Sequence, residues 1–153
     1  MNYNIPQVGE LKLNTIILDL NGTLTVGGKL VEGTSERLQK LKTLGFKIIF
    51  FSGDTRGNAS QIAKELGIDF IKASTGEDKR KETEKLNPEN CVSIGNGLID
   101  LEMMKIVKLS IVTLQAEGVH TQTLLASDIV VPSIIDGLDL LLDSERLIAT
   151  LRK

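Results

Sequence analysis

The chain lacks tryptophan and contains one tyrosine, one histidine and one cysteine among its 153 residues. The few aromatic residues and the formal net charge of −2 argue against a general nucleic-acid-binding protein, which needs a basic surface. A single cysteine cannot form an intramolecular disulfide, which fits a reducing compartment, so we expect a cytoplasmic protein. Because Cys91 lies within an apolar run, we expect a buried structural thiol and not a nucleophile.

Long hydrophobic runs are also missing. No run approaches the roughly 18 residues that a membrane-spanning helix needs, so we expect no membrane partner. The N-terminus does not show a basic region followed by an apolar one, and nothing there predicts a secretion signal. With 41% hydrophobic and 25% charged residues, the composition is that of an ordinary globular protein, and the length predicts one domain over residues 1–153.

Apolar runs typical of buried strands alternate along the chain with amphipathic segments typical of helices. We expect strands near residues 15–19, 46–51, 68–71, 91–94, 109–114 and 129–131. Helices are expected near residues 35–44, 58–66, 79–86, 98–107 and 119–126, with one or two more over 136–151. This alternation predicts an α/β, three-layer Rossmann-like fold with a mainly parallel sheet and helices on both faces. Residues 1–13 contain two short extended pieces that predict a small hairpin.

Polar residues collect where three of the predicted strands end. These clusters are Asp19-Leu-Asn-Gly-Thr23, Ser52-Gly-Asp54 and Gly95-Asn-Gly-Leu-Ile-Asp100. One aspartate after a strand is often only a turn residue, and Asp54 could equally cap the helix that follows it. Because the carboxyl ends of parallel strands share one edge of a sheet, however, we expect the three clusters to converge on a functional site.

The residue types in these clusters suit phosphoryl chemistry. Asp19 is a candidate metal ligand or nucleophile, and Mg²⁺ would find oxygen ligands in Asp19, Asp100 and an amide oxygen. Ser52 offers a hydroxyl to a phosphoryl oxygen, and the Asn21-Gly22-Thr23 turn offers backbone amides to an anion. Lys79 could supply positive charge to a transition state. It lies in a strongly charged run, where an exposed helix face is the ordinary interpretation and Arg80 and Lys81 are the alternatives.

The motifs resemble those of the haloacid dehalogenase superfamily, and most of all the phosphorylation domain of P-type transport ATPases. Asp19–Thr25 is similar to their Asp-Lys-Thr-Gly-Thr-Leu-Thr motif, and Ser52-Gly53-Asp54 to their Thr-Gly-Asp motif.

Two further motifs follow in the same order. Asp78-Lys79, with Leu86 seven residues after Lys79, matches their Asp-Lys motif, and Gly95–Asp100 is similar to their Gly-Asp-Gly-x-Asn-Asp motif. The likeness covers roughly residues 15–131 and is of the kind seen in small soluble P-type-ATPase-like proteins.

The resemblance implies a role for each matching residue. Asp19 would be the nucleophile that forms an aspartyl phosphate, and Lys79 would neutralise both nucleophile and phosphate. The phosphoryl group would be held by Gly22, Thr23, Ser52, Gly53 and Lys79. A Mg²⁺ cofactor would be held by Asp19, the backbone carbonyl of Asn21, Asp100 and, as a further ligand, Asn96.

Two residues depart from the family's pattern. The phosphatases of the superfamily have an aspartate two residues after the nucleophile, where it protonates the leaving group and activates water, but this chain has Asn21. A metal-binding aspartate is usual where Asn96 stands. We therefore expect weak Mg²⁺ affinity and slow turnover, best with leaving groups that need no proton. The alternative is a phosphate- or nucleotide-binding regulatory protein with little catalytic activity.

The segment between Thr25 and Phe46 has room for only a loop and one helix. Relatives that select small substrates insert a cap domain there or after the third strand, and we expect no cap in this chain. An open site needs a macromolecular substrate or a neighbouring subunit to exclude water. We therefore expect a phosphorylated small molecule or a phosphoprotein as substrate, and a homo-oligomer formed through exposed Val26, Leu30 and Val31.

Overall fold

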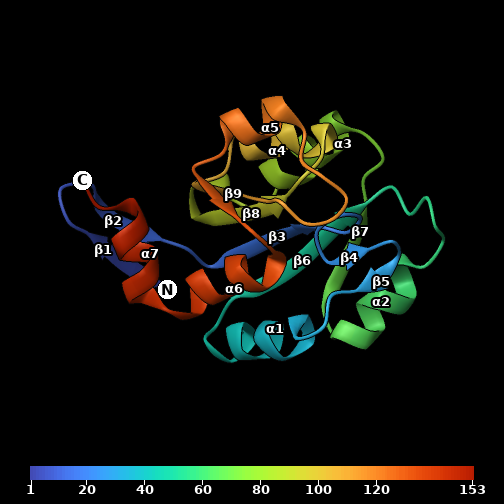
Figure 1. Ribbon diagram of the computed structural model, residues 1–153, viewed down its shortest axis with the longest axis horizontal. Helices are drawn as coiled ribbons and strands as arrows, with labels where there is room; N and C mark the ends of the chain where they lie inside the picture. Colours follow the sequence, from blue (N-terminus) through green and yellow to red (C-terminus); the bar gives the residue numbers. More distant parts are fainter.

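A six-stranded parallel sheet lies at the centre of the computed structural model, which describes residues 1–153 (Figure 1). The strand order is β10–β9–β8–β3–β6–β7, and every neighbouring pair is parallel. The strands are β3 (Thr15–Asp19), β6 (Lys47–Ser52), β7 (Asp69–Lys72), β8 (Cys91–Gly95), β9 (Leu109–Thr113) and β10 (Ile129–Val131). The predicted strands are therefore all present, with small shifts of their ends.

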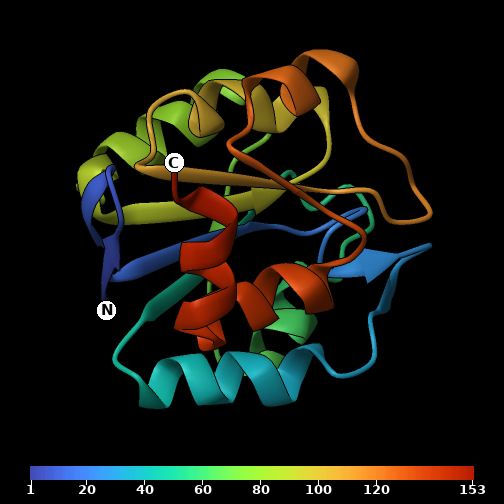
Figure 2. The ribbon, with the colours of Figure 1, turned by 60° about the vertical axis from the view of Figure 1, so that its left-hand side comes forward.

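Helices cover both faces of the sheet (Figures 1 and 2). One face carries α1 (Thr34–Thr43), α2 (Ala59–Leu66) and α6 (Ile134–Leu142), and the other carries α3 (Gly76–Glu84), α4 (Leu101–Met104) and α5 (Thr121–Ala126). Short 3₁₀ turns occur at Pro88–Asn90 and Leu98–Asp100. This arrangement confirms the predicted three-layer α/β fold. None of the helices has the length and apolar character needed to cross a membrane.

The sheet carries a hydrophobic cluster on each of its two faces. A cluster of 27 buried residues joins it to α1, α2, α6 and the C-terminal helix, and a smaller cluster of 6 lies under α3 and α4. Cys91 belongs to the smaller cluster, is buried, and contacts the backbone carbonyls of Leu86 and Asn87. Burial raises the pKa of its thiol to about 11, so Cys91 is the structural thiol that its apolar neighbours predicted.

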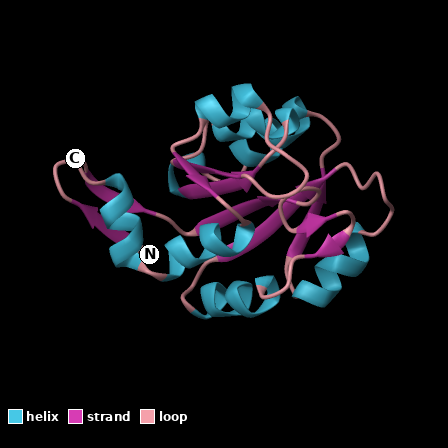
Figure 3. Cartoon of the chain, viewed as in Figure 1, coloured by secondary structure: helices cyan, strands magenta, loops and turns pink.

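The N-terminal residues form the predicted hairpin, β1 (Asn2–Ile5) and β2 (Gly9–Lys12), which pair antiparallel (Figure 3). The C-terminal helix α7 (Ser144–Leu151) packs against β1. The buried Tyr3 hydroxyl donates a hydrogen bond to the carbonyl of Leu141 at the end of α6, 3.0 Å away. The two ends of the chain are thus held together, at the left of Figure 1.

Two helices differ from the prediction. Helix α3 begins at Gly76, before the predicted start at residue 79, because Thr75 and Asp78 form a capping box at its N-terminus. The predicted helix over residues 98–107 is instead a 3₁₀ turn followed by the short α4. The turn is tightened by Asp100, whose carboxylate accepts hydrogen bonds from backbone N–H groups at the end of β8.

Between β3 and β6 the chain forms only a small hairpin and α1, so the expected absence of a cap domain is confirmed. The hairpin, β4 (Thr25–Val26) and β5 (Lys29–Leu30), was not predicted. It corrects one expectation: Val26, Leu30 and Val31 are half-buried, and Leu30 and Val31 pack against the core of their own chain.

Candidate active site

The predicted polar clusters meet at the carboxyl edge of the sheet. β3 is hydrogen-bonded to β6 on one side and β8 on the other, so Asp19, Ser52 and Gly95 end three adjacent strands. A cavity of about 160 Å³ opens at this edge. It is lined by Asp19, Asn21, Ser52, Gly53, Thr55, Ser74, Lys79, Asn96, Gly97 and Ile99. Such a position beside a central strand is where open α/β sheets bind their ligands.

A buried cation bridges two carboxylates at the floor of this cavity. Lys79 Nζ lies 2.6 Å from Asp19 Oδ1 and 2.7 Å from Asp100 Oδ1. Lys79 and Asp100 are fully buried, and Asp19 is 6% exposed, on its cavity side. The sequence places these residues far apart, and the fold brings them into one charged cluster.

The start of α3 explains why a lysine from a charged segment is buried. The Thr75–Asp78 capping box sets the phase of the helix so that Lys79 and Thr83 face the sheet. Arg80 and Lys81, the alternatives for the catalytic cation, instead form exposed ion pairs on the outer surface of α3. The prediction of an exposed helix face is thus confirmed for Arg80 and Lys81 and wrong for Lys79.

The buried charges act on one another. The pKa of Asp19 is raised to about 7, because burial and the charge of Asp100 raise it more than the charge and hydrogen bond of Lys79 lower it. Burial on its own would lower the pKa of Lys79, but the charges of Asp100 and Asp19 and the hydrogen bonds to them hold it above its usual range. Lys79 is therefore protonated at neutral pH.

Asp100 also organises the end of β8. Its Oδ2 accepts hydrogen bonds from the backbone N–H groups of Asn96 and Gly97, both at 3.0 Å. A Cβ atom on Gly95 would lie 2.5 Å from that oxygen, so glycine is required there for Asp100 to approach the backbone. One carboxylate thus holds both Lys79 and the turn that carries Asn96.

The turn after Asp19 is closed by its own hydrogen bonds. The Gly22 N–H donates to the Thr25 carbonyl at 2.8 Å, and the Thr23 N–H donates to the Leu20 carbonyl at 3.3 Å. Gly22 has φ +80°, a conformation that favours glycine. Neither Gly22 nor Thr23 lines the cavity. The two amides expected to bind phosphate therefore support the loop in this structure and do not face the cavity.

The two asparagines differ in their surroundings. Asn96 Nδ2 donates to the Gly118 carbonyl at 2.9 Å, and Asn96 Oδ1 accepts from the Thr23 hydroxyl at 3.3 Å. An aspartate at position 96 could not make the bond to Gly118, because a carboxylate has no N–H to donate. Asn21 Oδ1, in contrast, is buried at the cavity without any hydrogen-bond partner.

Ser52 and Asp54 have separate tasks. Ser52 Oγ accepts the Asp54 N–H at 3.0 Å, which leaves the hydroxyl proton of Ser52 free for a group in the cavity. The Asp54 carboxylate accepts the N–H of Ala59, the first residue of α2, at 2.9 Å. Asp54 therefore caps the N-terminus of α2, one of the two roles that the sequence allowed for it.

Several residues of the site could not be found from the motifs. Thr55, Ser74 and Ile99 line the cavity, and Gln115 holds the Asp19 loop from behind. Only Ser74 had a usable signal nearby, the Thr75-x-x-Asp78 capping box that fixes where α3 starts.

The oxygen atoms at the cavity fit a divalent cation. Asp19 supplies a carboxylate at the cavity, Asp100 lies behind it against Lys79, and the unpartnered Asn21 Oδ1 is the kind of neutral oxygen that Mg²⁺ accepts. No group of three or more His, Cys, Asp or Glu side chains is arranged to hold a metal in the structure, and the cavity is lined by Asn21 and Asn96 besides Asp19.

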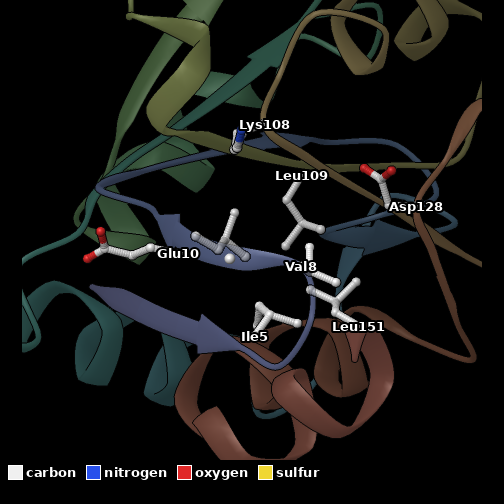
Figure 4. A pocket seen from close by; sticks show the side chains of 9 residues that line it. Ile5, Val8, Glu10, Lys108, Leu109, Asp128 and Leu151 are labelled. Carbon is white, nitrogen blue, oxygen red and sulfur yellow. The ribbon is translucent and has the colours of Figure 1, made fainter. Parts of the chain in front are cut away.

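Another cavity, of about 220 Å³, lies at the opposite end of the sheet, between the β1–β2 hairpin, the start of β9 and the end of α7 (Figure 4). Its lining is mainly apolar, with Glu10, Lys108 and Asp128 at its border. It has no buried cation and no facing carboxylates, so it does not suit phosphoryl chemistry.

Comparison with known proteins agrees with the geometry. The family model described as haloacid dehalogenase-like hydrolase matches residues 26–107, just over half of the chain. The chain belongs to this family. The matched segment contains Ser52, Lys79, Asn96 and Asp100 and begins after the Asp19 loop.

Relatives of the chain include a "soluble P-type ATPase-like phosphatase" of Methanocaldococcus jannaschii, 29% identical over 135 residues. That alignment covers 85% of this chain but 50% of the relative, so the chain spans about half of that protein's length. The resemblance to P-type-ATPase-like proteins inferred from the motifs is thereby confirmed.

Solved structures of two phosphatases show the same fold. The cobalt-bound deoxy-D-mannose-octulosonate 8-phosphate phosphatase of Haemophilus influenzae has a TM-score of 0.75 at 17% identity, covering 93% of this chain and 94% of that one. The 3-deoxy-D-manno-octulosonate 8-phosphate phosphatase of Moraxella catarrhalis, in complex with magnesium, phosphate and a KDO molecule, has a TM-score of 0.71 at 22% identity, covering 92% and 94%.

The buried cation yields a stability prediction. Replacing Lys79 by methionine (Lys79→Met) leaves Asp19 and Asp100 facing each other in the interior without a counter-charge. We expect it to lower the free energy of unfolding by about 3–5 kcal/mol, measured by urea denaturation. The control Lys81→Met, two residues along the same helix, removes only an exposed ion pair with Glu77 and should change it by less than about 0.5 kcal/mol. Equal unfolding midpoints for the two variants would contradict the proposed charge cluster.

Proposed function

We propose that this chain is a Mg²⁺-dependent phosphohydrolase or phosphotransferase that acts through an aspartyl phosphate on Asp19. The observation that supports it most is the Lys79 bridge between Asp19 and Asp100, on a cavity that also exposes Ser52. A carboxylate that ends a central strand, next to a fixed cation and a free hydroxyl, suits attack on a phosphoryl group.

In the first half-reaction a carboxylate oxygen of Asp19 attacks phosphorus. A bond from that oxygen to phosphorus forms, the bond from phosphorus to the leaving-group oxygen breaks, and the leaving group keeps the electron pair. The Ser52 hydroxyl donates to a non-bridging phosphoryl oxygen, while the Lys79 ammonium balances the charge of Asp19 and the phosphoryl group. These groups are held in place before the reaction, so little reorganisation is needed.

Asp19, the backbone carbonyl of Asn21, Asp100 and Asn96 would hold the cation. When bound, Mg²⁺ supplies positive charge that favours the ionised form of Asp19 and screens the phosphoryl oxygens. Because Asn96 is neutral and shares its oxygen with the Thr23 hydroxyl, we propose that Mg²⁺ affinity is weak.

In the second half-reaction water attacks phosphorus, the bond to the Asp19 oxygen breaks, the proton of the water passes to the phosphate or to solvent, and inorganic phosphate leaves. This step gains from a group that takes the proton of the water, and Asn21 has no proton to exchange at neutral pH. We therefore propose that the phosphoenzyme is hydrolysed slowly. The same lack of an acid favours substrates such as acyl phosphates or ATP, whose leaving groups need no proton.

The cavity has no cap domain over it, which supports a phosphoprotein, or a phosphorylated small molecule enclosed by a second subunit. A homo-oligomer stays a proposal, and the predicted surface is less exposed than expected. Val26, Leu30 and Val31 are half-buried, whereas Leu98, which follows the cavity residue Gly97, is 52% exposed.

The proposal predicts a covalent adduct. After incubation with Mg²⁺ and acetyl phosphate, we expect the protein to carry a phosphoryl group that survives acid and is released by hydroxylamine, as an acyl phosphate is. The matched variant Asp19→Asn should carry none, because its amide is not a nucleophile. Intact-mass spectrometry measures both. A folded wild-type protein that stays unmodified at high Mg²⁺ with both acetyl phosphate and ATP would contradict the proposal and favour the phosphate-binding regulatory protein.

A second prediction concerns Asn21. Replacing it by aspartate (Asn21→Asp) places an exchangeable proton beside the leaving group and should raise the turnover of an aryl phosphate by about 10²-fold. The control Asn4→Asp changes the same residue type on the exposed surface of β1 and should leave turnover unaltered. Equal turnover of wild type and Asn21→Asp would show that Asn21 does not limit hydrolysis. Because Asn21 precedes Gly22, intact mass must first exclude deamidation, which would create the same aspartate in the wild type.

A further inference from the structure

Gln115 is a buried amide that ties the loop after Asp19 to the rest of the fold. It follows β9 closely and is 8% exposed. Its Nε2 donates to the Gly22 carbonyl at 3.1 Å and to the Thr23 carbonyl at 2.7 Å, and its Oε1 accepts the Ile134 N–H at 2.7 Å. One side chain thus connects the Asp19 loop with the first residue of α6.

The chemistry of this contact requires a glutamine. The two carbonyls need two N–H donors and the Ile134 N–H needs an acceptor, and a neutral side-chain amide has all of these groups. Glutamate could keep the bond to Ile134 but would set a carboxylate against two carbonyl oxygens. Methionine, which has a similar length, could replace none of the three bonds.

Gln115 holds the peptide plane that follows Gly22, and the Thr25 carbonyl holds the plane that precedes it. The Gly22 N–H is held by the Thr25 carbonyl, and the Gly22 C=O is held by Gln115 with help from the Thr113 hydroxyl at 3.3 Å. In a planar trans peptide the C=O and the following N–H point in opposite directions. The Thr25 bond therefore sets the direction of the Asn21 carbonyl, and the Gln115 bonds hold the turn in the position in which the Gly22 N–H meets Thr25.

We propose that Gln115 is a positioning residue, an inference that rests on the proposed function. It would orient the Asn21 carbonyl and side chain toward the reacting phosphoryl group and its Mg²⁺. It touches neither of them. It acts through the Gly22 and Thr23 carbonyls and makes no hydrogen bond to the Ser52 loop, which would bind the phosphoryl group. Loss of Gln115 should therefore impair the chemical step and metal binding more than the affinity for substrate.

The experiment compares wild type with Gln115→Met and Gln115→Glu by the rate of adduct formation at saturating acetyl phosphate. We expect both variants to be slower by about 10²-fold, the effect of a misplacement near 1 Å. The Mg²⁺ concentration at half-saturation should rise by about tenfold. The acetyl phosphate concentration at half-saturation should change by less than about twofold, because the Ser52 loop is untouched.

Two controls separate positioning from stability. Gln39→Met removes another glutamine bond to a carbonyl, the 2.8 Å contact with Leu66 far from the cavity, and should change only thermal stability. Gln115→Glu keeps the acceptor for Ile134, so it tests the loss of the two donated bonds if Gln115→Met does not fold. A Gln115→Glu variant with the wild-type rate and Mg²⁺ dependence would overturn the inference.

A readout that does not depend on activity completes the test. Amide hydrogen exchange across residues 19–25 should be faster in both Gln115 variants than in wild type and Gln39→Met. The Mg²⁺ dependence of the thermal midpoint should shift to higher concentration in the same two variants. If wild type forms no adduct, the proposed function fails, and these two measurements still decide the role of Gln115. Unaltered exchange and unaltered Mg²⁺ dependence in both variants would overturn it.

Discussion

The burial of one lysine between two carboxylates is the constraint on which the site depends. Taking an ion from water into a protein interior costs several kcal/mol, so Lys79 is tolerated only because Asp19 and Asp100 contact its ammonium directly. The neighbouring backbone serves the same contact. The Thr75–Asp78 capping box turns Lys79 inward, and Gly95 leaves room for Asp100 beside the end of β8.

The parallel sheet gives this charge cluster its place. Asp19 and Gly95 end adjacent strands, so their side chains and turns meet at one edge without any long loop. Lys79 comes from α3, which lies on one face of the sheet. Gln115, which holds the loop after Asp19, follows β9, the strand next to β8. Residues that are distant in the sequence thus hold a short loop in a single conformation.

Much of this arrangement could be predicted from the sequence, because hydrophobic runs that stop at a polar residue mark strand ends. Asp19 and Ser52 were found in this way, and their convergence followed from the parallel sheet. The pattern of α3 could not show that Lys79 is buried, since its neighbours are charged and periodicity finds only apolar faces. Gln115 could not be found at all, because its contacts with Gly22 and Thr23 span more than ninety residues of sequence and no local pattern records them.

The two asparagines show the limit of reading function from a motif. The hydrogen bond from Asn96 to the Gly118 carbonyl explains why asparagine stands at position 96, because an aspartate could not make it. Asn21 has no such partner, and its buried Oδ1 stays without a hydrogen bond beside the cavity. Under the proposed function, a site with Asp19 and Lys79 but without an acid at position 21 would accept a phosphoryl group and release it slowly.

The most direct test of Asp19 as the phosphoryl acceptor is ¹⁹F NMR spectroscopy with beryllofluoride, which mimics a phosphoryl group bound to a carboxylate. With Mg²⁺ and beryllofluoride, the wild-type protein should give protein-bound fluorine resonances distinct from those of the free species, and Asp19→Asn should give none. Identical spectra for folded wild type and Asp19→Asn, or no bound resonance in either, would contradict the account.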